Sequence, residues 1–73
     1  MTRKLTAIIE HEDKGFVALC PEFDIASQGE SIEIARENLQ EALELFFETA
    51  SNEEIQKRFL GEIYITQLEV TIE

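Results

Sequence analysis

Apolar and polar positions follow a strand-like pattern near both ends of the chain and a helical period in the middle. Residues 5–11 form an apolar, β-branched run that is typical of a strand, and residues 16–20 form a second run of the same kind. Between them, residues 12–15 (EDKG) predict a tight turn in which Gly15 takes the left-handed conformation. The chain therefore opens with a predicted β-hairpin.

Pro21 and Gly29 mark the limits of a third predicted strand. Pro21 has no N–H to donate to a sheet, so it ends the second strand and opens a bend. Residues 25–28 then predict a short strand, which Gly29 ends. Three strands joined by tight turns predict an antiparallel meander.

The middle of the chain predicts one long helix, from an N-cap at Ser31 to about Ala50. Glu33 lies in its first turn, where the helix dipole favours an acid. At about 100° per residue, seven apolar side chains fall within an arc of about 100° and form the expected buried stripe. They are Ile32, Ala35, Leu39, Ala42, Leu43, Phe46 and Ala50.

The last third of the chain predicts a short helix and a final strand. Residues 51–54 (SNEE) match a capping box, which predicts a helix that carries Ile55 and Phe59 on one face and ends at Gly61. Residues 62–72 predict a strand whose apolar phase shifts near its middle. Such a shift suggests a bulge or a change of face.

The predicted element order is β-β-β-α-(short α)-β, a single α+β domain over residues 1–73. Because a strand–helix–strand crossover is right-handed, we expect the fourth strand to lie parallel to the first, with the helices on one face of the sheet. Both sheet faces carry apolar side chains, and one helix layer covers only one of them. A single cysteine excludes an internal disulfide and a cysteine-based zinc cluster. These points favour a homo-oligomer (dimer or tetramer) over a well-packed monomer.

The charge balance changes which partners are expected. Sixteen acidic and six basic residues give a net charge of −10. Such a surface repels a phosphate backbone and attracts a basic protein, so we expect no direct nucleic-acid binding. No apolar stretch approaches the roughly 20 residues that span a bilayer, and no signal peptide is visible. We therefore expect a cytoplasmic protein without membrane contact.

Acidic residues on the long helix form the most informative pattern. Five of them project within about 80° of one another, opposite the apolar stripe. They are Glu33, Glu37, Glu41, Glu44 and Glu48. Arg36 is the only base between them, so little on the helix offsets their repulsion. Two interpretations stay open, a solvated helix face and a docking strip for cationic residues of a partner. Ile34, Leu45 and Phe47 flank the acids outside the apolar stripe, which favours the docking strip.

Polar residues outside this helix predict no enzyme. His11 is the only histidine, and the neighbouring acids sit where adjacent side chains point apart, so we expect no metal site. Ser27 has no histidine partner nearby, and Cys20 is interpreted as a small buried hydrophobe. The element order is also the front half of a ribonuclease H-like fold, whose two-metal chemistry needs clustered inward carboxylates. The helical acids face away from the sheet, so we expect no catalysis and no cofactor.

Residues 20–31 (CPEFDIASQGES) resemble the signature of the HicB antitoxin family, which runs as C-P-E-L, a short bend, S-Q-G, an acid, and serine or threonine. The family signature goes on with E-E-A and N-L-x-E-A. In this chain it continues at Glu33, Ala35, Asn38, Leu39, Glu41 and Ala42. The likeness covers about residues 4–48. Departures are Phe23, where leucine is usual, and Ile34, where a second glutamate is common.

The resemblance implies a partial ribonuclease H-like fold without nuclease activity. Members of the family neutralise HicA, a small basic ribonuclease, by covering its RNA-binding surface or its active site. Many carry a C-terminal DNA-binding module, for which the 73 residues leave no room, so we expect a short form without one. The sequence thus predicts an antitoxin-like protein whose five helical glutamates, Ile34 and Leu45 bind a basic HicA-like toxin. The alternative is a homo-oligomeric structural or small-ligand-binding module that has no toxin.

Overall fold

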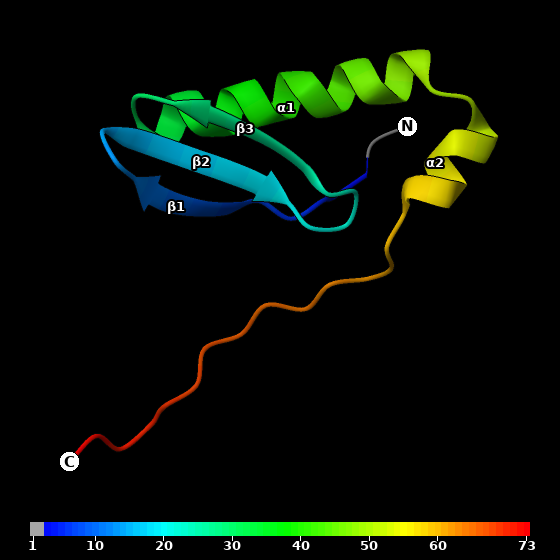
Figure 1. The fold of residues 1–73 in the computed structure, drawn as a ribbon. Coiled ribbons are helices and arrows are strands. Elements are labelled where there is room, and N and C mark those ends of the chain that lie inside the picture. The colour runs from blue at the N-terminus through cyan, green and yellow to red at the C-terminus, as the bar shows by residue number, and fades with distance from the viewer. Residues whose placement is uncertain (1–2) are drawn as a thin grey trace.

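A three-stranded antiparallel sheet and two helices make up the fold (Figure 1). The computed structural model describes residues 3–73, so the first two residues of the expected domain lie outside it. The elements are β1 (Ile8–Glu12), β2 (Gly15–Cys20), β3 (Ile25–Gly29), α1 (Ile32–Thr49) and α2 (Asn52–Arg58). The strands are ordered β1-β2-β3, which confirms the predicted α+β class and the meander. Among residues 3–73, no helix is long and apolar enough to cross a membrane.

The first strand begins three residues later than predicted, at Ile8 rather than at residue 5. The register pairs Ile8 with Leu19, and its continuation would bring Thr6 opposite Pro21. Proline has no N–H to offer a neighbouring strand. The Thr6 amide instead donates to the carboxylate of Glu22, at 3.1 Å from each oxygen. The sheet therefore ends where the proline interrupts the hydrogen-bond ladder.

In the turn between β1 and β2, the left-handed residue is Asp13, with φ 54°, and the prediction for Gly15 was wrong. Aspartate tolerates this region because its short polar side chain can bond locally. Gly15 is instead the first residue of β2 and lies against β3. A Cβ there would stand 2.8 Å from the carbonyl oxygen of Gly29. Gly15 therefore allows β2 and β3 to approach each other closely.

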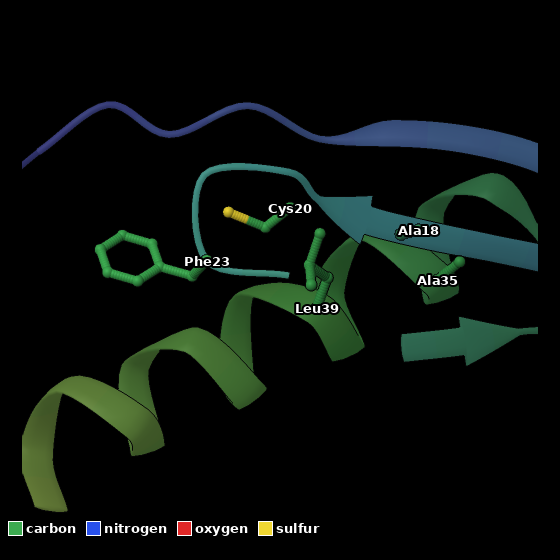
Figure 2. Close-up of a cluster of buried hydrophobic side chains, with 5 residues drawn as sticks. All are labelled: Ala18, Cys20, Phe23, Ala35 and Leu39. Atoms are coloured by element: carbon green, nitrogen blue, oxygen red, sulfur yellow. The ribbon is translucent and has the colours of Figure 1, made fainter. Parts of the chain in front are cut away.

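Helix α1 crosses one face of the sheet, and its predicted limits are confirmed. The Ser31 hydroxyl accepts from the Ile34 amide at 3.1 Å and caps the helix. Gly29 lets the first turn come close, because a Cβ on it would lie 2.5 Å from the backbone nitrogen of Ala35. The core forms between this helix, β2 and the turn that follows β2 (Figure 2). Its buried members are Ala18, Cys20, Phe23, Ala35 and Leu39.

The buried stripe of α1 differs from the prediction at both ends. Ile32 is 52% exposed, because Ile34 and the backbone of Ala35 form the part of the first turns that lies against Gly29. Phe47, predicted to lie outside the stripe, packs against Phe23 with ring centroids 5.1 Å apart. Phe59, which follows α2, stands 5.5 Å from the same Phe23 ring. The segment after α1 thus widens the buried face at the C-terminal end of the helix.

Helix α2 starts with the predicted capping box, in which the Ser51 hydroxyl accepts from the Glu54 amide at 3.1 Å. It ends at Arg58 and not at Gly61, because contacts with the turn after β2 take over there. Arg58 donates to the carbonyl of Phe23 at 3.0 Å. The amide of residue 60 donates to the carbonyl of residue 22 at 2.7 Å. These bonds attach α2 to the turn at the end of the sheet.

The predicted fourth strand does not form within this chain. Among the described residues, 62–72 make no strand and do not pair with β1. Residues 62–73, called the C-terminal tail below, run in extended form away from the body (Figure 1). The radius of gyration is accordingly 14.4 Å, against about 11 Å for a compact chain of this length. The alternating apolar pattern of this segment marks it as strand-forming and leaves its partner open.

Candidate protein-binding surface

Helix α1 carries five carboxylates on one side, and this set is called the acidic strip. It consists of Glu33, Glu37, Glu41, Glu44 and Glu48, and all five side chains are exposed, as predicted. The opposite side of the helix is buried through Ala35 and Leu39, so the strip faces away from the sheet. At 1.5 Å per residue, the strip is about 22 Å long. The helix period alone fixes this arrangement.

Electrostatic repulsion is built into the acidic strip. Successive members lie three or four residues apart, and each such like-charged pair costs a few tenths of a kcal/mol. Arg36 is the only basic residue between Glu33 and Glu48. A cationic surface laid on the strip would relieve this repulsion and would gain charge-assisted hydrogen bonds. The strip therefore carries like-charge repulsion that the helix itself leaves largely unrelieved.

The two apolar residues predicted to lie beside the strip, Leu45 and Ile34, differ in how far their side chains are exposed. Leu45 is 60% exposed. Ile34 is 42% exposed, and one of its methyl carbons lies over Gly29 of β3, which holds the side chain in place. Phe47 is half-buried against the core, so it does not belong to this surface. The exposed apolar border of the strip consists of Leu45 and the outer part of Ile34.

Apolar residues also occupy the sheet face that α1 does not cover, as predicted. The register aligns Ile8, Leu19 and Ala26 in one row across the three strands. Val17 lies in the next row, between Glu10 and Gln28. These positions alternate with those that contact α1, such as Ala18 and Cys20. The sheet thus offers a second surface of mixed apolar and polar character, called the outer face below.

A buried carboxylate, Glu22, organises the turn after β2, and sequence reasoning missed it. Its side chain accepts from the amide and the hydroxyl of Thr6 and from the thiol of Cys20, the hydroxyl at 2.7 Å and the thiol at 3.4 Å. Only 7% of the residue is exposed. Burial raises the pKa of this carboxyl, but the hydrogen bonds from Thr6 and Cys20 outweigh it and hold the pKa below its usual value. The one available signal was that Pro21, aligned with Thr6, leaves an amide without a strand partner.

The side chains of Cys20 and His11 are both engaged with neighbouring residues. Burial, followed by the hydrogen bond to Glu22, raises the pKa of the Cys20 thiol, so it stays protonated and is a poor nucleophile. The ring of His11 packs edge-on against Phe16, with centroids 5.0 Å apart. Within residues 3–73, no three histidine, cysteine or acidic side chains are grouped so as to hold a metal ion.

Two open hollows lie away from the strip. One is bordered by the β1–β2 turn and the end of β3. The other, of about 340 Å³, lies between residues 3–6 and residues 59–64. Glu22 lines the second hollow, but its carboxylate is already bonded to Thr6 and Cys20. This hollow lies between the base of the C-terminal tail and the N-terminal segment.

Compared with known proteins, the chain matches no family model, no curated protein and no solved structure.

Proposed function

We propose that this protein is an antitoxin-like protein that binds a small basic ribonuclease of the HicA type and masks its RNA-binding surface. The single observation that carries the proposal is the acidic strip, five exposed carboxylates on one helix face with one base among them. A toxin that binds RNA must present cations to the phosphate backbone. A row of carboxylates about 22 Å long competes for those cations.

The resemblance to the HicB signature supports the same proposal. Pro21 opens the turn, Glu22 is buried in it, Gly29 admits the helix, and Ser31 caps the helix. The residues that carry the resemblance thus occupy constrained positions that set the direction of α1. The β-β-β-α order is also that of the front half of a ribonuclease H-like fold, and we include the partial ribonuclease H-like fold, with a fourth strand, in the proposal. The proposed activity is inhibition, in which the protein occupies the RNA-binding surface of the toxin.

The test exchanges charge on the strip and at matched positions elsewhere. The strip variant is Glu37→Lys, Glu41→Lys and Glu44→Lys in one chain. The control is Glu12→Lys, Glu53→Lys and Glu73→Lys, which makes the same charge change at exposed sites away from α1. Affinity for a HicA-type protein encoded beside this one is measured by calorimetry at several salt concentrations.

We expect the strip variant to lose at least about a hundredfold in affinity, because three attractive contacts become repulsive. The control should lose less than about tenfold, through the long-range field alone. Binding by the parent should weaken with added salt. Equal losses in both variants would show that only net charge matters, and unchanged affinity in the strip variant would refute the proposal. Circular dichroism of both variants checks that the fold is retained.

A second candidate function, a homo-oligomeric module without a toxin, is favoured by a different observation. The C-terminal tail exposes apolar residues that nothing else in the described chain covers. If no basic protein co-purifies from native cells and the tagged protein recovers only copies of itself, this second function is preferred.

A further inference from the structure

We propose that the C-terminal tail of one chain adds as a fourth strand to the free edge of β1 in a second copy, whose own tail reciprocates to form a two-fold symmetric dimer. This goes beyond the proposed function, because neutralisation through the acidic strip does not need a dimer. It rests on three features of the described chain. They are an exposed strand-forming segment, an unpaired sheet edge, and a glycine of positive φ between the body and the segment.

The tail has the composition of a strand that lacks a partner. Its large apolar side chains are between 36% and 87% exposed. They are Ile63, Tyr64, Ile65, Leu68, Val70 and Ile72. Most are β-branched or aromatic residues, which favour strands. Each Å² of apolar surface removed from water contributes about 25 cal/mol, so burying six such side chains is a substantial driving force. A monomer that leaves such a run in water is unusual.

The acceptor for this strand is the free edge of β1. In the described chain, β1 pairs with β2 and with no other strand. On the opposite edge, β3, one backbone acceptor is already used, because the Asn38 side chain of α1 donates to the carbonyl of Gln28 at 2.8 Å. An open edge beside an apolar sheet face is a template for an added strand. The outer face, with Ile8 next to that edge, supplies the apolar neighbours.

The base of the tail is fixed, and the tail then departs from its own body. Arg3 lies over the ring of Phe59, 4.9 Å from its centroid, which holds the start of the segment beside the N-terminal residues. Gly61 follows with φ 109°, and nothing lies within 4 Å of the place where a Cβ would be. This conformation suits glycine and directs the tail away from β1 of the same chain (Figure 1). Its strand-forming residues are thus presented to another molecule.

A second copy fits the dimensions of the tail and of the acceptor edge. The 12 residues of the tail, at about 3.3 Å each, reach about 40 Å, enough to span β1 and the extended residues before it. With residues 3–12 as acceptor, each chain contributes 22 residues, within the 20–30 per side of a standard interface. The tail carries three acids and no base, and the acceptor has Arg3 and Lys4 at its start and Glu10 and Glu12 near its end. The acidic strip lies on the side of α1 that faces away from the sheet, so it is not part of the β1 edge.

The experiment measures mass and tail protection for the full chain. One variant, Leu68→Asp with Val70→Asp, places charges in the apolar phase of the tail. The matched control, Gln67→Asp with Thr71→Asp, adds the same charge in the polar phase. Sedimentation equilibrium gives the mass of each, and hydrogen exchange reads the amides of residues 63–72.

We expect the parent and the control to sediment at twice the chain mass of 8.4 kDa, with protected tail amides. The apolar-phase variant should be monomeric with unprotected tail amides, its dimer dissociation constant raised at least about a hundredfold, because carboxylates would be buried without partners. A monomeric parent, with its tail protected or not, overturns the proposal. So does a dimer with unprotected tail amides, or a dimer that survives both substitutions. If the tail amides become protected only when a basic partner protein is added, that partner and not a second copy supplies the neighbouring strand, and the proposal is overturned.

Discussion

At the scale of single residues, Glu22 shows how one buried charge sets the end of the sheet. Its carboxylate takes the Thr6 amide that Pro21 leaves without a strand partner. A buried charge is costly unless hydrogen bonds satisfy it, and three donor groups do so here. Residue 22 also accepts from the residue 60 amide through its carbonyl. This residue therefore joins the N-terminal segment, the turn and the end of α2.

The first prediction follows from the lowered pKa of this carboxyl. Replacing Glu22 by glutamine keeps the shape and removes the charge that the donors favour, so we expect a loss of about 1–3 kcal/mol in the free energy of unfolding at neutral pH. A group with a depressed folded pKa stabilises above its unfolded value, near 4.5, and loses this contribution as the pH falls through the folded pKa. The difference in the free energy of unfolding between the parent and the variant should therefore become smaller below pH 4.5.

Urea titrations of both proteins at neutral and at acid pH measure this difference. Glu30→Gln, at an exposed position between β3 and α1, is the control and should change stability little at either pH. If this difference in stability stayed constant on acidification, Glu22 would stabilise the fold through packing and not through its charge.

At the scale of elements, the contact between β3 and α1 depends on a missing side chain. A Cβ on Gly29 would lie 2.5 Å from the Ala35 nitrogen and 2.7 Å from a methyl carbon of Ile34. The nitrogen belongs to a hydrogen-bonded helix turn and cannot yield without moving α1. The helix therefore approaches the sheet as closely as its backbone allows.

Gly29→Ala should accordingly destabilise the fold by about 1–3 kcal/mol, since it overpacks this contact. The midpoint of thermal unfolding by circular dichroism measures the effect. Gln28→Ala, one residue earlier and exposed, serves as the control and should shift the midpoint little. An unchanged midpoint for the glycine variant would mean that α1 can shift freely on β3.

Elements with local signals were predictable from the sequence, and those set by tertiary contacts were not. The limits of α1 follow from the Ser31 cap and the helix period, and the exposure of the acidic strip follows from the same period. The later start of β1 depends on a carboxylate 16 positions away, and the burial of Phe47 depends on Phe23 and on the segment after α1. The tail pattern predicted a strand, but alternation in a sequence does not specify which molecule supplies the neighbouring strand.

At the scale of the whole molecule, the net charge of −10 on 73 residues opposes compactness. Five of the sixteen acidic residues lie together in the acidic strip on one helix. Salt shortens the range of this repulsion, from about 30 Å at 0.01 M to about 8 Å at 0.15 M. The folded state should gain more from screening than the expanded chain, because its charges lie closer together.

We therefore expect the melting temperature to rise by about 2–6 °C over this salt range, the size of a stabilisation of about 0.5–1 kcal/mol in a domain of this length. Scanning calorimetry with sodium chloride and with potassium chloride separates screening from specific ion binding. Glu37→Gln with Glu41→Gln should melt higher at low salt and respond less to added salt. A melting temperature that fell with salt would show that attractive ion pairs dominate.

The placement of the single tyrosine has a practical consequence. The chain has no tryptophan, and Tyr64 lies in the C-terminal tail, 83% exposed. Intrinsic ultraviolet emission of the native protein thus originates in the tail and carries little information about the core. Quenching of that emission by iodide or acrylamide follows the tail in solution without any attached dye, while far-ultraviolet dichroism reads the helices and the sheet independently.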